Sequence, residues 1–412
     1  MEPRRCAVIG AGVLGASIAA RLAAAGQHVT LLDQREPGQA TSRWSFAWIN
    51  SNDKAPRHYH DLNQAGIRAW AELAPGLDGP AWHRPVGHVE LAADPDELAA
   101  RVRRLADWGY PARLITAAEA AELEPALKPP APGVPAAWFP EEGYLLTEPL
   151  IDRLVADAAS HGATILTGDQ GRVTALAEGR VHTGTGAILE ADEIVCCAGR
   201  WTPALAALAT SPGAAPPAPP VAAPLPPPGV APPGSAPPGV ASPVPLIPWD
   251  TPGSTAPGLV VRVGPVDGAG PSRVLHTPQL ALRPHPGGLV HLEAEDTSAA
   301  ADLHTPDPEL RGLAAELLDR ARRTVHGLDH ATVVDYQVCV RPLPADGQSV
   351  VGRLPGAGWL YVAVTHSGVT LAAHLSRLIA ADLTTAGLTT GVPPAELAPY
   401  RPDRFLAARP SA

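Results

Sequence analysis

The stretch VIGAGVLGASIAARLAAAGQHVTLLD, residues 8–33, decides the fold of this chain. The apolar run 5–9 predicts a buried strand, and the glycines that follow it predict a tight turn into a helix over 16–25. A second strand is predicted over 27–32, and Asp33 stands directly after it. A strand, a glycine turn, a helix, a strand and a terminal acid in this order are typical of a βαβ unit that binds a dinucleotide.

The three glycines of the turn have separate physical roles. Gly10 permits the tight turn, Gly12 lets a pyrophosphate approach the backbone, and Gly15 lets the helix pack closely on the strand. The free N–H groups at the start of the helix favour a phosphate. Asp33 is placed to accept hydrogen bonds from ribose hydroxyls, and a carboxylate there disfavours a 2′-phosphate. The unit therefore predicts FAD or NAD rather than NADP.

Composition and charge exclude several classes of protein. A length of 412 residues is enough for two lobes and a sizeable core. The four cysteines are too few and too badly spaced for a disulfide framework or a metal knuckle, and no metal site is expected. The net charge is −10, and the basic residues form no long run, which argues against nucleic acid and anionic membranes as partners.

The N-terminal sequence also bears on location. Arg4-Arg5 before an apolar stretch could be taken for a secretory signal, but glycines interrupt that stretch and a strand pattern follows it directly. No run reaches the ~18–20 apolar residues of a membrane span. We expect a cytoplasmic protein without a membrane span.

Proline is unevenly distributed along the chain. The sequence has 49 prolines, and they crowd the segment from Ser211 to Pro248. Each proline removes a backbone donor and fixes one dihedral, so this segment cannot form a helix or a central strand. We expect a disordered, polyproline-like loop insertion over 209–245.

The remaining patterns alternate between helix and strand. Helices are predicted over 56–73, 95–108, 116–123, 148–161, 308–326 and 368–385. Strands are predicted over 87–93, 163–167, 172–176, 180–183, 193–197, 258–263, 274–276, 279–283, 289–293 and 359–364. The polar and aromatic segment Ala40–Lys54 is predicted to be a loop.

Five motifs follow one another along the chain. After residues 8–33 come TEPLIDRLVADAASHGATI (147–165), EIVCCAGRW (193–201), VRPLPADGQSVVG (340–352) and YVAVTHSGVTLAAHLSRLIAADL (361–383). This series resembles the family of FAD enzymes that contains D-amino-acid oxidase, glycine oxidase and sarcosine oxidase. The resemblance spans nearly the whole chain except the proline-rich segment.

The resemblance implies an α/β fold with two domains. A discontinuous Rossmann-like FAD-binding domain would comprise 1–82, 144–202 and 337–412. A mixed α+β substrate-binding domain, built on an antiparallel sheet, would comprise 83–143 and 203–336. The residues agree, because the turn at His366-Ser367-Gly368 gives a second helix N-terminus for a dinucleotide with two halves. An NAD-dependent dehydrogenase would more often keep its dinucleotide domain contiguous.

The resemblance also implies where FAD would bind. The glycine turn would hold the pyrophosphate, the loop after Ala40 would run along the flavin, Val173 would pair its backbone with the adenine, and the C-terminal turn would receive the ribityl chain and flavin O2. The cofactor-binding residues expected on this basis are Gly10, Gly12, Val13, Leu14, Gly15, Asp33, Gln34, Thr41, Ser42, Phe46, Ala47, Val173, Ala198, Gly199, Trp201, Ser367, Gly368, Val369 and Thr370.

The chemistry implied is the oxidation of a C–N bond. Hydride transfer from the substrate α-carbon to flavin N5 gives an imine, and it requires alignment and a neutral amine more than an acid/base side chain. Arg341 matches the arginine that binds the substrate carboxylate in glycine oxidase-like members, although a cap at a strand end is the alternative. The expected catalytic residues are Arg341, His366, Trp48 and Asn50. The partners would be an amine or amino acid, and oxygen or another electron acceptor.

Two positions depart from the family pattern. Glycine oxidases carry a second arginine where this chain has His366, and sarcosine oxidases carry a lysine where it has Thr370. Both departures remove positive charge, which predicts a bulkier or less acidic amine than glycine or sarcosine. His366 is either a ligand contact or a backbone-bonded turn residue. Arg283 and His285 are further pocket candidates, with a solvated hairpin as the alternative.

Three further interpretations concern cysteines and aromatic residues. Cys339 aligns with the cysteine that sarcosine oxidases attach to the flavin. Relatives with an Arg-Pro motif bind FAD noncovalently, so noncovalent FAD is expected and a covalent link is the alternative. Cys196 and Cys197 are expected to be packing residues. The cluster of Trp44, Phe46 and Trp48 would wall the flavin or pack at the domain interface, with Trp48 and Asn50 facing the active site.

The expected function is therefore FAD-dependent oxidation of an amine, glycine, a D-amino acid or an N-alkyl amino acid. The alternatives are an NAD-dependent dehydrogenase and a flavin-binding protein without turnover.

Overall fold

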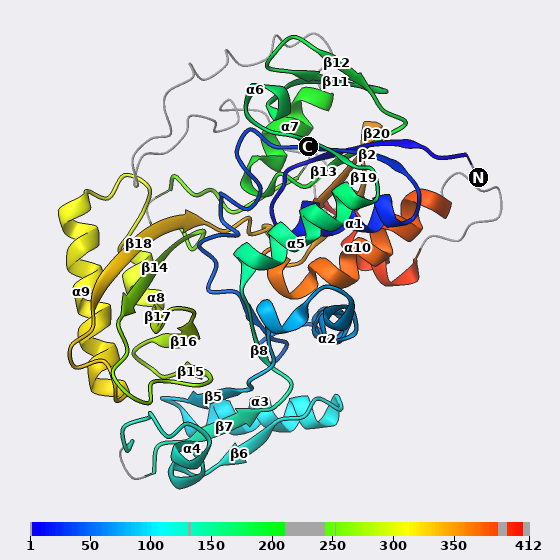
Figure 1. Ribbon diagram of the computed structural model, residues 1–412. Coiled ribbons are helices and arrows are strands. Elements are labelled where there is room, and N and C mark those ends of the chain that lie inside the picture. The colour runs from blue at the N-terminus through cyan, green and yellow to red at the C-terminus, as the bar shows by residue number, and fades with distance from the viewer. Residues whose placement is uncertain (1, 131–132, 211–243, 252, 386–393, 407–412) are drawn as a thin grey trace, which may run out of the picture.

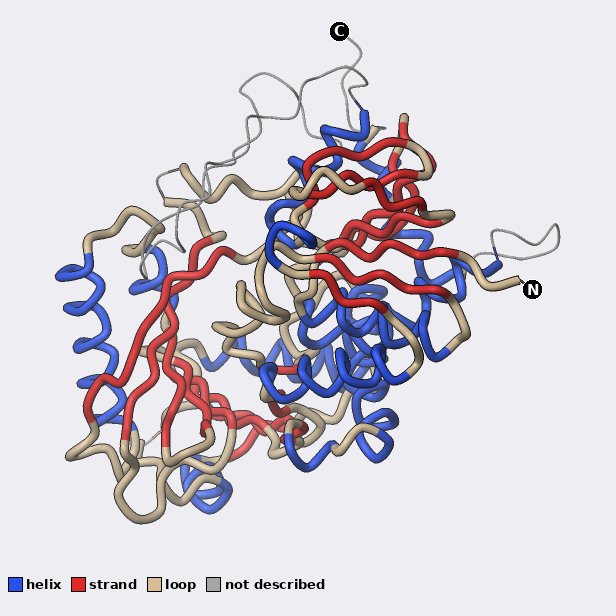
Figure 2. The backbone as a smooth tube through the Cα atoms, turned by 45° about the horizontal axis from the view of Figure 1, so that its top comes forward, coloured by secondary structure: helices blue, strands red, loops and turns tan. Residues whose placement is uncertain are grey.

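Two large sheets organise the molecule, each in a lobe of its own (Figures 1 and 2). The computed structural model describes residues 2–130, 133–210, 244–251, 253–385 and 394–406. Most of the proline-rich insertion predicted over 209–245 lies outside these residues. Within the described part of the chain, no helix combines the length and apolar character needed to cross a membrane.

The first sheet has six strands in the order β19-β20-β13-β1-β2-β9. Its strands are β1 (Arg5–Ile9), β2 (His28–Leu32), β9 (Thr164–Leu166), β13 (Glu193–Cys196), β19 (Val350–Leu354) and β20 (Ala357–Val364). All neighbours are parallel except β19 and β20. The register places Val8 beside Leu31 on one side and Val195 on the other. The predicted βαβ unit is confirmed, and the C-terminal strand β20 completes the sheet that the N-terminal strand begins.

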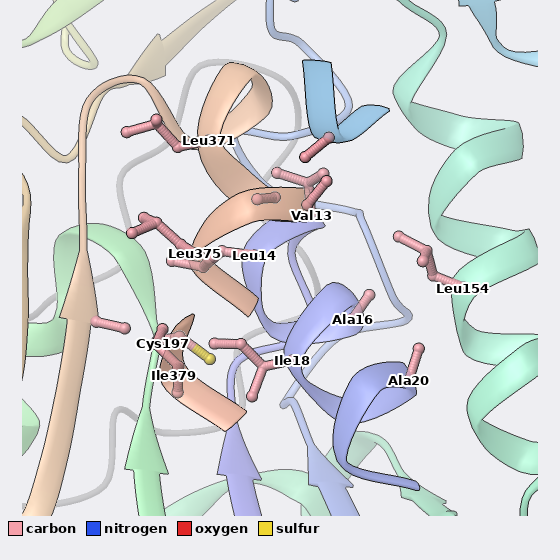
Figure 3. Packing of buried hydrophobic residues seen from close by; sticks show 14 of the residues in the cluster. Val13, Leu14, Ala16, Ile18, Ala20, Leu154, Cys197, Leu371, Leu375 and Ile379 are labelled. Atoms are coloured by element: carbon pink, nitrogen blue, oxygen red, sulfur yellow. The ribbon is translucent and has the colours of Figure 1, made fainter. Parts of the chain in front are cut away.

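Helices α1 (Val13–Ala24), α5 (Thr147–Ser160) and α10 (Gly368–Thr385) form a layer beside this sheet, with α1 in contact with the other two. Helix α2 (Arg57–Leu73) packs against α10. Leu14 and Ile18 of α1 lie against Leu375 and Ile379 of α10, whereas Ala16 faces α5 (Figure 3). Small side chains such as Ala16 let the helix axes approach, and each buried leucine or isoleucine contributes about 1.5–3 kcal/mol. Helix α1 begins three residues earlier than predicted, because it starts directly after Gly12.

The second sheet has eight strands in the order β18-β14-β17-β16-β15-β5-β7-β6. Its strands are β5 (His88–Leu91), β6 (Arg113–Ile115), β7 (Ala136–Phe139), β14 (Pro257–Gly264), β15 (Val274–His276), β16 (Ala281–His285), β17 (Leu289–Glu293) and β18 (Thr332–Val340). All neighbours are antiparallel except β5 and β15. Helix α9 (Asp307–Thr324) packs against β14, β17 and β18, where it buries Leu317 and Leu318. The predicted α+β lobe built on an antiparallel sheet is confirmed, with one parallel pair within it.

Two small sheets complete the described strands. One comprises β3 (Trp48–Ile49), β8 (Gly143–Leu145) and β4 (His83–Arg84), and the other β10 (Val173–Ala177), β11 (Arg180–Thr183) and β12 (Ile188–Glu190). The remaining helices are α3 (Pro95–Asp107), α4 (Ala117–Leu123), α6 (Gly168–Gly171), α7 (Thr202–Thr210) and α8 (Glu295–Ala299), with 3-10 turns at Ala74–Gly76, Gly79–Ala81, Gly199–Trp201, Ala395–Tyr400 and Pro402–Phe405.

Several observed elements differ from the expectations. The segment predicted to be a loop over Ala40–Lys54 contains strand β3, and the strands β4, β6, β7, β8, β12, β18 and β19 were not predicted. Strand β18 runs without a break past residue 337, where a domain limit was placed, while α7 packs against β10 and β20. The domain limits stay a prediction.

Candidate active site

The glycine turn brings β1, α1 and β13 into close contact. Gly10 has a φ of +104°, and a Cβ atom there would lie 2.6 Å from the carbonyl oxygen of Cys197. A Cβ atom on Gly15 would lie 1.8 Å from the carbonyl oxygen of Gly10. No side chain larger than hydrogen fits at either position. The start of α1 is therefore held against the carboxyl ends of the parallel strands, where a phosphate can reach its amides.

Asp33 fixes the shape of this turn from the end of β2. Its carboxylate accepts the amide of Ala11 at 2.8 Å and the amide of Arg35 at 2.9 Å. Burial raises the pKa of the Asp33 carboxyl, and the two amides act against that shift. Gln34, the next residue, is exposed. The role of both residues toward a ribose stays a prediction.

The segment after Ala40 ties the glycine turn to both lobes. Ser42 Oγ accepts the amide of Val13 at 3.1 Å, and the Ser42 carbonyl accepts the hydroxyl of Thr147 at 2.7 Å. The Thr41 hydroxyl donates to the carbonyl of Val340 at 2.9 Å. Ala47 has a φ of +57°, a conformation that an alanine adopts only when its surroundings impose it. The segment is therefore a fixed element, although it has little regular structure.

The aromatic cluster lies across the face of the eight-stranded sheet. Alternate residues of the segment each meet a basic or imidazole side chain of that sheet. The pairs are Trp44 with the Arg262 guanidinium at 4.3 Å, Phe46 with that of Arg283 at 5.6 Å, and Trp48 with the His276 ring at 4.3 Å. The interpretation of the cluster as interface packing is thus confirmed, while a role as flavin wall stays a prediction.

The C-terminal turn meets this segment at Trp48. The Thr370 hydroxyl donates to the carbonyl of Trp48 at 3.5 Å, and the Tyr59 hydroxyl donates to Ser367 Oγ at 3.1 Å. The carbonyl of Val369 accepts the indole N–H of Trp70 at 2.8 Å. The glycine turn, the aromatic segment and the C-terminal turn, predicted separately as cofactor-binding segments, therefore form one continuous region.

Arg341 and His366 lie within electrostatic reach of each other. Burial, and then the positive charges of Lys54 and Arg341, lower the pKa of the His366 imidazole to about 3. Arg341 Nη2 donates to the carbonyls of Thr255 at 2.5 Å and Pro257 at 3.3 Å, while its Nε is buried without a partner. The site thus holds the positive charge of Arg341, and no described residue accepts a hydrogen bond from its Nε.

Asn50 contributes a second unsatisfied polar atom. Its side chain is buried, its amide N–H donates to the carbonyl of Trp48 at 3.4 Å, and its Oδ1 has no partner in the described part of the chain. Buried polar atoms are paired in nearly all proteins, so orphans of this kind indicate a place for a ligand. Together with the glycine turn, which a Cβ atom would fill, these atoms fit an extended dinucleotide with a polar substrate beside it.

The remaining predicted cofactor residues lie around β13 and β10. Val173 pairs with Thr183 between β10 and β11. Ala198 follows β13, Gly199 has a φ of +56°, and the Arg200 guanidinium lies 4.4 Å from the Trp201 ring. Burial lowers the pKa of the Arg200 side chain to about 10. Their contacts with a cofactor stay a prediction.

The solvated-hairpin alternative is wrong for Arg283. Its side chain is buried and donates to the carbonyls of Phe46 and Pro284 and to Nδ1 of His291. Together with His285 it lines a cavity of about 410 Å³ next to the start of α5. The rings of His285 and His291 stack at 4.3 Å. Arg283 is buried because the aromatic segment covers the face of the sheet from which its side chain projects.

Sequence reasoning missed a buried group centred on Glu142. His88 of β5, His276 of β15 and Tyr110 join it, and all come from segments that carry no motif. Each histidine stands alone in an apolar strand, and only the pairing of β5 with β15 brings the two together. The one signal in the sequence is the presence of histidine at positions that face a core.

Comparison with known proteins gives a consistent result. The family model described as "FAD dependent oxidoreductase" matches residues 5–382. The oxidoreductase YurR of Bacillus subtilis, itself uncharacterized, is 24% identical over 97% of this chain and 99% of its own length. The bifunctional tRNA 5-methylaminomethyl-2-thiouridine biosynthesis protein MnmC of Cupriavidus necator is 33% identical over 42% of this chain, and the chain spans 27% of that protein's length.

A solved structure agrees in fold. Glycine oxidase from Geobacillus kaustophilus superposes with a TM-score of 0.73 at 21% identity, covering 97% of this chain and 98% of the other. At this identity the match establishes the arrangement of the two lobes and nothing about the substrate. Among the described residues, no group of three or more His, Cys, Asp or Glu side chains suits a metal ion.

The lowered pKa of His366 has a consequence for stability. The unfolded chain protonates this imidazole below about pH 6.5, whereas the folded protein resists protonation down to about pH 3. The unfolded state therefore binds more protons in this window, and stability falls as the pH falls through it. When the pH is lowered from about 7 to about 4, the free energy of unfolding should decrease in both proteins, and it should decrease less in His366→Gln than in wild type.

Urea unfolding of the purified protein at both pH values measures this difference. His330→Gln, at an exposed position, is the matched control and should behave as wild type. An equal loss in His366→Gln and wild type would show that this imidazole is protonated as easily in the folded protein as in the unfolded chain.

Proposed function

Because the chain belongs to the DAO family of FAD-dependent oxidoreductases, we propose that it oxidises the C–N bond of an amine or amino acid to an imine, which water then hydrolyses. The observation that carries this proposal is the cationic site at the C-terminal turn, where Arg341 and Lys54 both act on His366. The electrons would go to oxygen or to another acceptor.

The residues that would hold FAD are those of the three meeting segments. Gly10, Gly12, Gly15 and the start of α1 would take the pyrophosphate, and Asp33 the ribose. Ser42 and the turn Ser367–Thr370 would lie along the remainder of the cofactor. FAD supplies a hydride acceptor for the α-carbon of the substrate. The chain itself would bind and orient the amine and exclude water from it.

A carboxylate on the substrate would bind at Arg341. Two backbone carbonyls hold Nη2 of this side chain in place, and the unpartnered Nε remains available for a charge-assisted hydrogen bond. His366 is neutral at physiological pH, because its pKa is lowered to about 3. The site would therefore neutralise one carboxylate at Arg341 and present an uncharged imidazole at His366. This supports a substrate with no more than one acidic group.

A screen of flavin bleaching tests the proposal. The purified protein should be yellow, with absorbance near ~450 nm that disappears anaerobically with the right amine. D-amino acids, N-methyl amino acids and cyclic imino acids are the compounds to test. A protein that stays yellow with all of them would be a flavin binder without turnover, and a colourless protein that reduces NAD would overturn the proposal.

Removal of the Arg341 side chain should separate substrate binding from cofactor binding. We expect Arg341→Ala to raise KM for a carboxylate substrate roughly 10- to 100-fold, the worth of one charge-assisted hydrogen bond. The flavin-to-protein absorbance ratio should not change. Arg323→Ala, at an exposed position on α9, is the control. An unchanged KM in Arg341→Ala would place the carboxylate contact elsewhere or indicate a substrate without one.

We further propose that FAD is held noncovalently. Cys339 Sγ lies 3.5 Å from the carbonyl of Trp44, and burial raises the pKa of its thiol to about 12, so the nucleophilic thiolate is scarce. Mass spectrometry of the denatured protein should give the mass of the unmodified chain, with the flavin released into the supernatant. If the chain instead carried the additional mass of one flavin, and Cys339→Ser did not carry it, the covalent alternative would be established.

A further inference from the structure

Glu142 is a fully buried carboxylate surrounded by donors. It accepts six hydrogen bonds from the amides of Ser51 and Asn52, the Asn52 side chain, the Trp48 indole, the Tyr110 hydroxyl and Nδ1 of His88, at 2.7–3.2 Å. A carboxyl group that accepts this many bonds has no room for its own proton. Glu142 is therefore ionised, and its negative charge lies wholly inside the protein.

Among the described residues, His88 is the ionisable base in direct contact with this carboxylate; His60 also feels its charge, but His60 Nδ1 contacts Ser51 and not Glu142. His88 Nδ1 lies 3.1 Å from Glu142 Oε2, and both side chains are inaccessible to solvent. The other donors to Glu142 are neutral amides, an indole and a phenol. A buried charge without a partner is costly, and a proton delivered to the imidazole of His88 would place a compensating charge directly beside Glu142.

The hydrogen bonds fix the tautomers of the two histidines. Because Glu142 can only accept, His88 Nδ1 carries a hydrogen. Asn52 Nδ2, which lies 3.3 Å from the same nitrogen, is itself a donor and is satisfied by Glu142 Oε2 at 3.0 Å. Neutral His88 then offers a lone pair at Nε2. This atom lies 2.8 Å from Nδ1 of His276, which must then be the donor. The Nε2 atom of His276 is consequently a bare acceptor. No described residue hydrogen-bonds to it, and the side chain is partly exposed although it lies between the lobes.

His276 stands next to the region expected to hold the flavin. Its ring lies 4.3 Å from that of Trp48 and 6.0 Å from that of Phe46. The carbonyl of Trp48 in turn accepts the Thr370 hydroxyl of the C-terminal turn. The chain of groups from Glu142 through His88 to His276 thus runs from the interior of the second lobe to the point where the cofactor-binding segments meet.

We propose that Glu142, His88 and His276 form a proton relay, in which Nε2 of His276 takes a proton from the ammonium group of the substrate. This inference rests on the proposed function, because only a neutral amine can lose a hydride. The ammonium N–H bond breaks and an N–H bond forms at His276 Nε2, while the Nδ1 proton of His276 passes to Nε2 of His88. The relay gains one proton and ends with the His88 imidazolium beside the Glu142 carboxylate.

The other groups around His276 are compatible with this role. Burial, and then the nearby His88 and Arg101, lower the pKa of His276 far below its usual value, so the free ring is neutral and its imidazolium is disfavoured. A proton taken at Nε2 must therefore be matched by the transfer of the Nδ1 proton to His88, as the relay requires. Arg101 of α3 is paired with Glu90, which reduces its effect. Trp48 and Phe46 carry no charge. His276 is a catalytic residue in this scheme, and His88 and Glu142 position it and store the charge.

Nitrogen NMR of histidine in the flavin-loaded protein tests the relay without turnover. In ¹⁵N-histidine-labelled protein, the signals that disappear in His276→Gln identify His276. We expect these signals to show a neutral ring with the proton on Nδ1 and none on Nε2. A proton on Nε2 would overturn the proposal, because the atom facing the substrate could not accept.

Rapid-mixing kinetics supplies the functional arm. With the amine that bleaches the flavin best in the screen, His276→Gln should slow anaerobic bleaching at neutral pH by about 100-fold or more. The deficit should shrink toward high pH, where solvent has already deprotonated the amine, and the flavin content should match wild type. Glu142→Gln should show a deficit of the same kind, and His330→Gln none.

The outcomes separate the two proposals. A His276→Gln rate equal to wild type at every pH, or a deficit that is the same at every pH, would exclude proton transfer at this residue. If no amine bleaches the wild-type flavin, the proposed function fails, and the proton transfer fails with it. The NMR result then still reports whether the bare Nε2 acceptor exists.

Discussion

The close contact between the glycine turn and the end of β13 is the constraint on which this structure depends. The carbonyl oxygens of Gly10 and Cys197 occupy the space that side chains at Gly15 and Gly10 would need. Because α1 can approach so closely, its first amides stand at the carboxyl ends of four neighbouring parallel strands. Asp33 then holds the turn in place from the next strand. The glycines that let α1 pack closely on the sheet are thus also the residues that expose its first amides to a phosphate.

The aromatic segment carries this constraint into the second lobe. Near its beginning, Ser42 contacts the start of α1. Near its end, the amides of Ser51 and Asn52 donate to the carboxylate of Glu142. Between these ends, alternate aromatic rings cover basic and imidazole side chains of the eight-stranded sheet. The buried arginines and histidines of that sheet are tolerated because each has a ring, a carbonyl or another side chain as partner. The same contacts set the distance between the lobes, and hence the shape of the space for a substrate.

The sequence predicted local structure well and long-range pairing poorly. The strands β1 and β2 and the helices α1, α5 and α10 follow from apolar periodicity and from glycine and capping positions, which act within a few residues. Strand β18 was missed because its alternation is irregular, and the strand β3 because two residues give no period. For Arg283 the solvated hairpin was a reasonable alternative because its charge predicts exposure, and only the cover provided by Phe46 makes its burial possible.

The amino-acid sequence was enough to predict a dinucleotide-binding βαβ unit, a single fold that contains both ends of the chain, and Arg341 and His366 as the residues to examine. These properties are carried by short motifs, whose geometry is set by backbone conformation and by neighbouring residues. The meeting of His88, Glu142 and His276 becomes visible only in the folded chain. The parallel pairing of β5 with β15 joins segments 188 residues apart, and it is selected by the burial of both lobes rather than by any local preference.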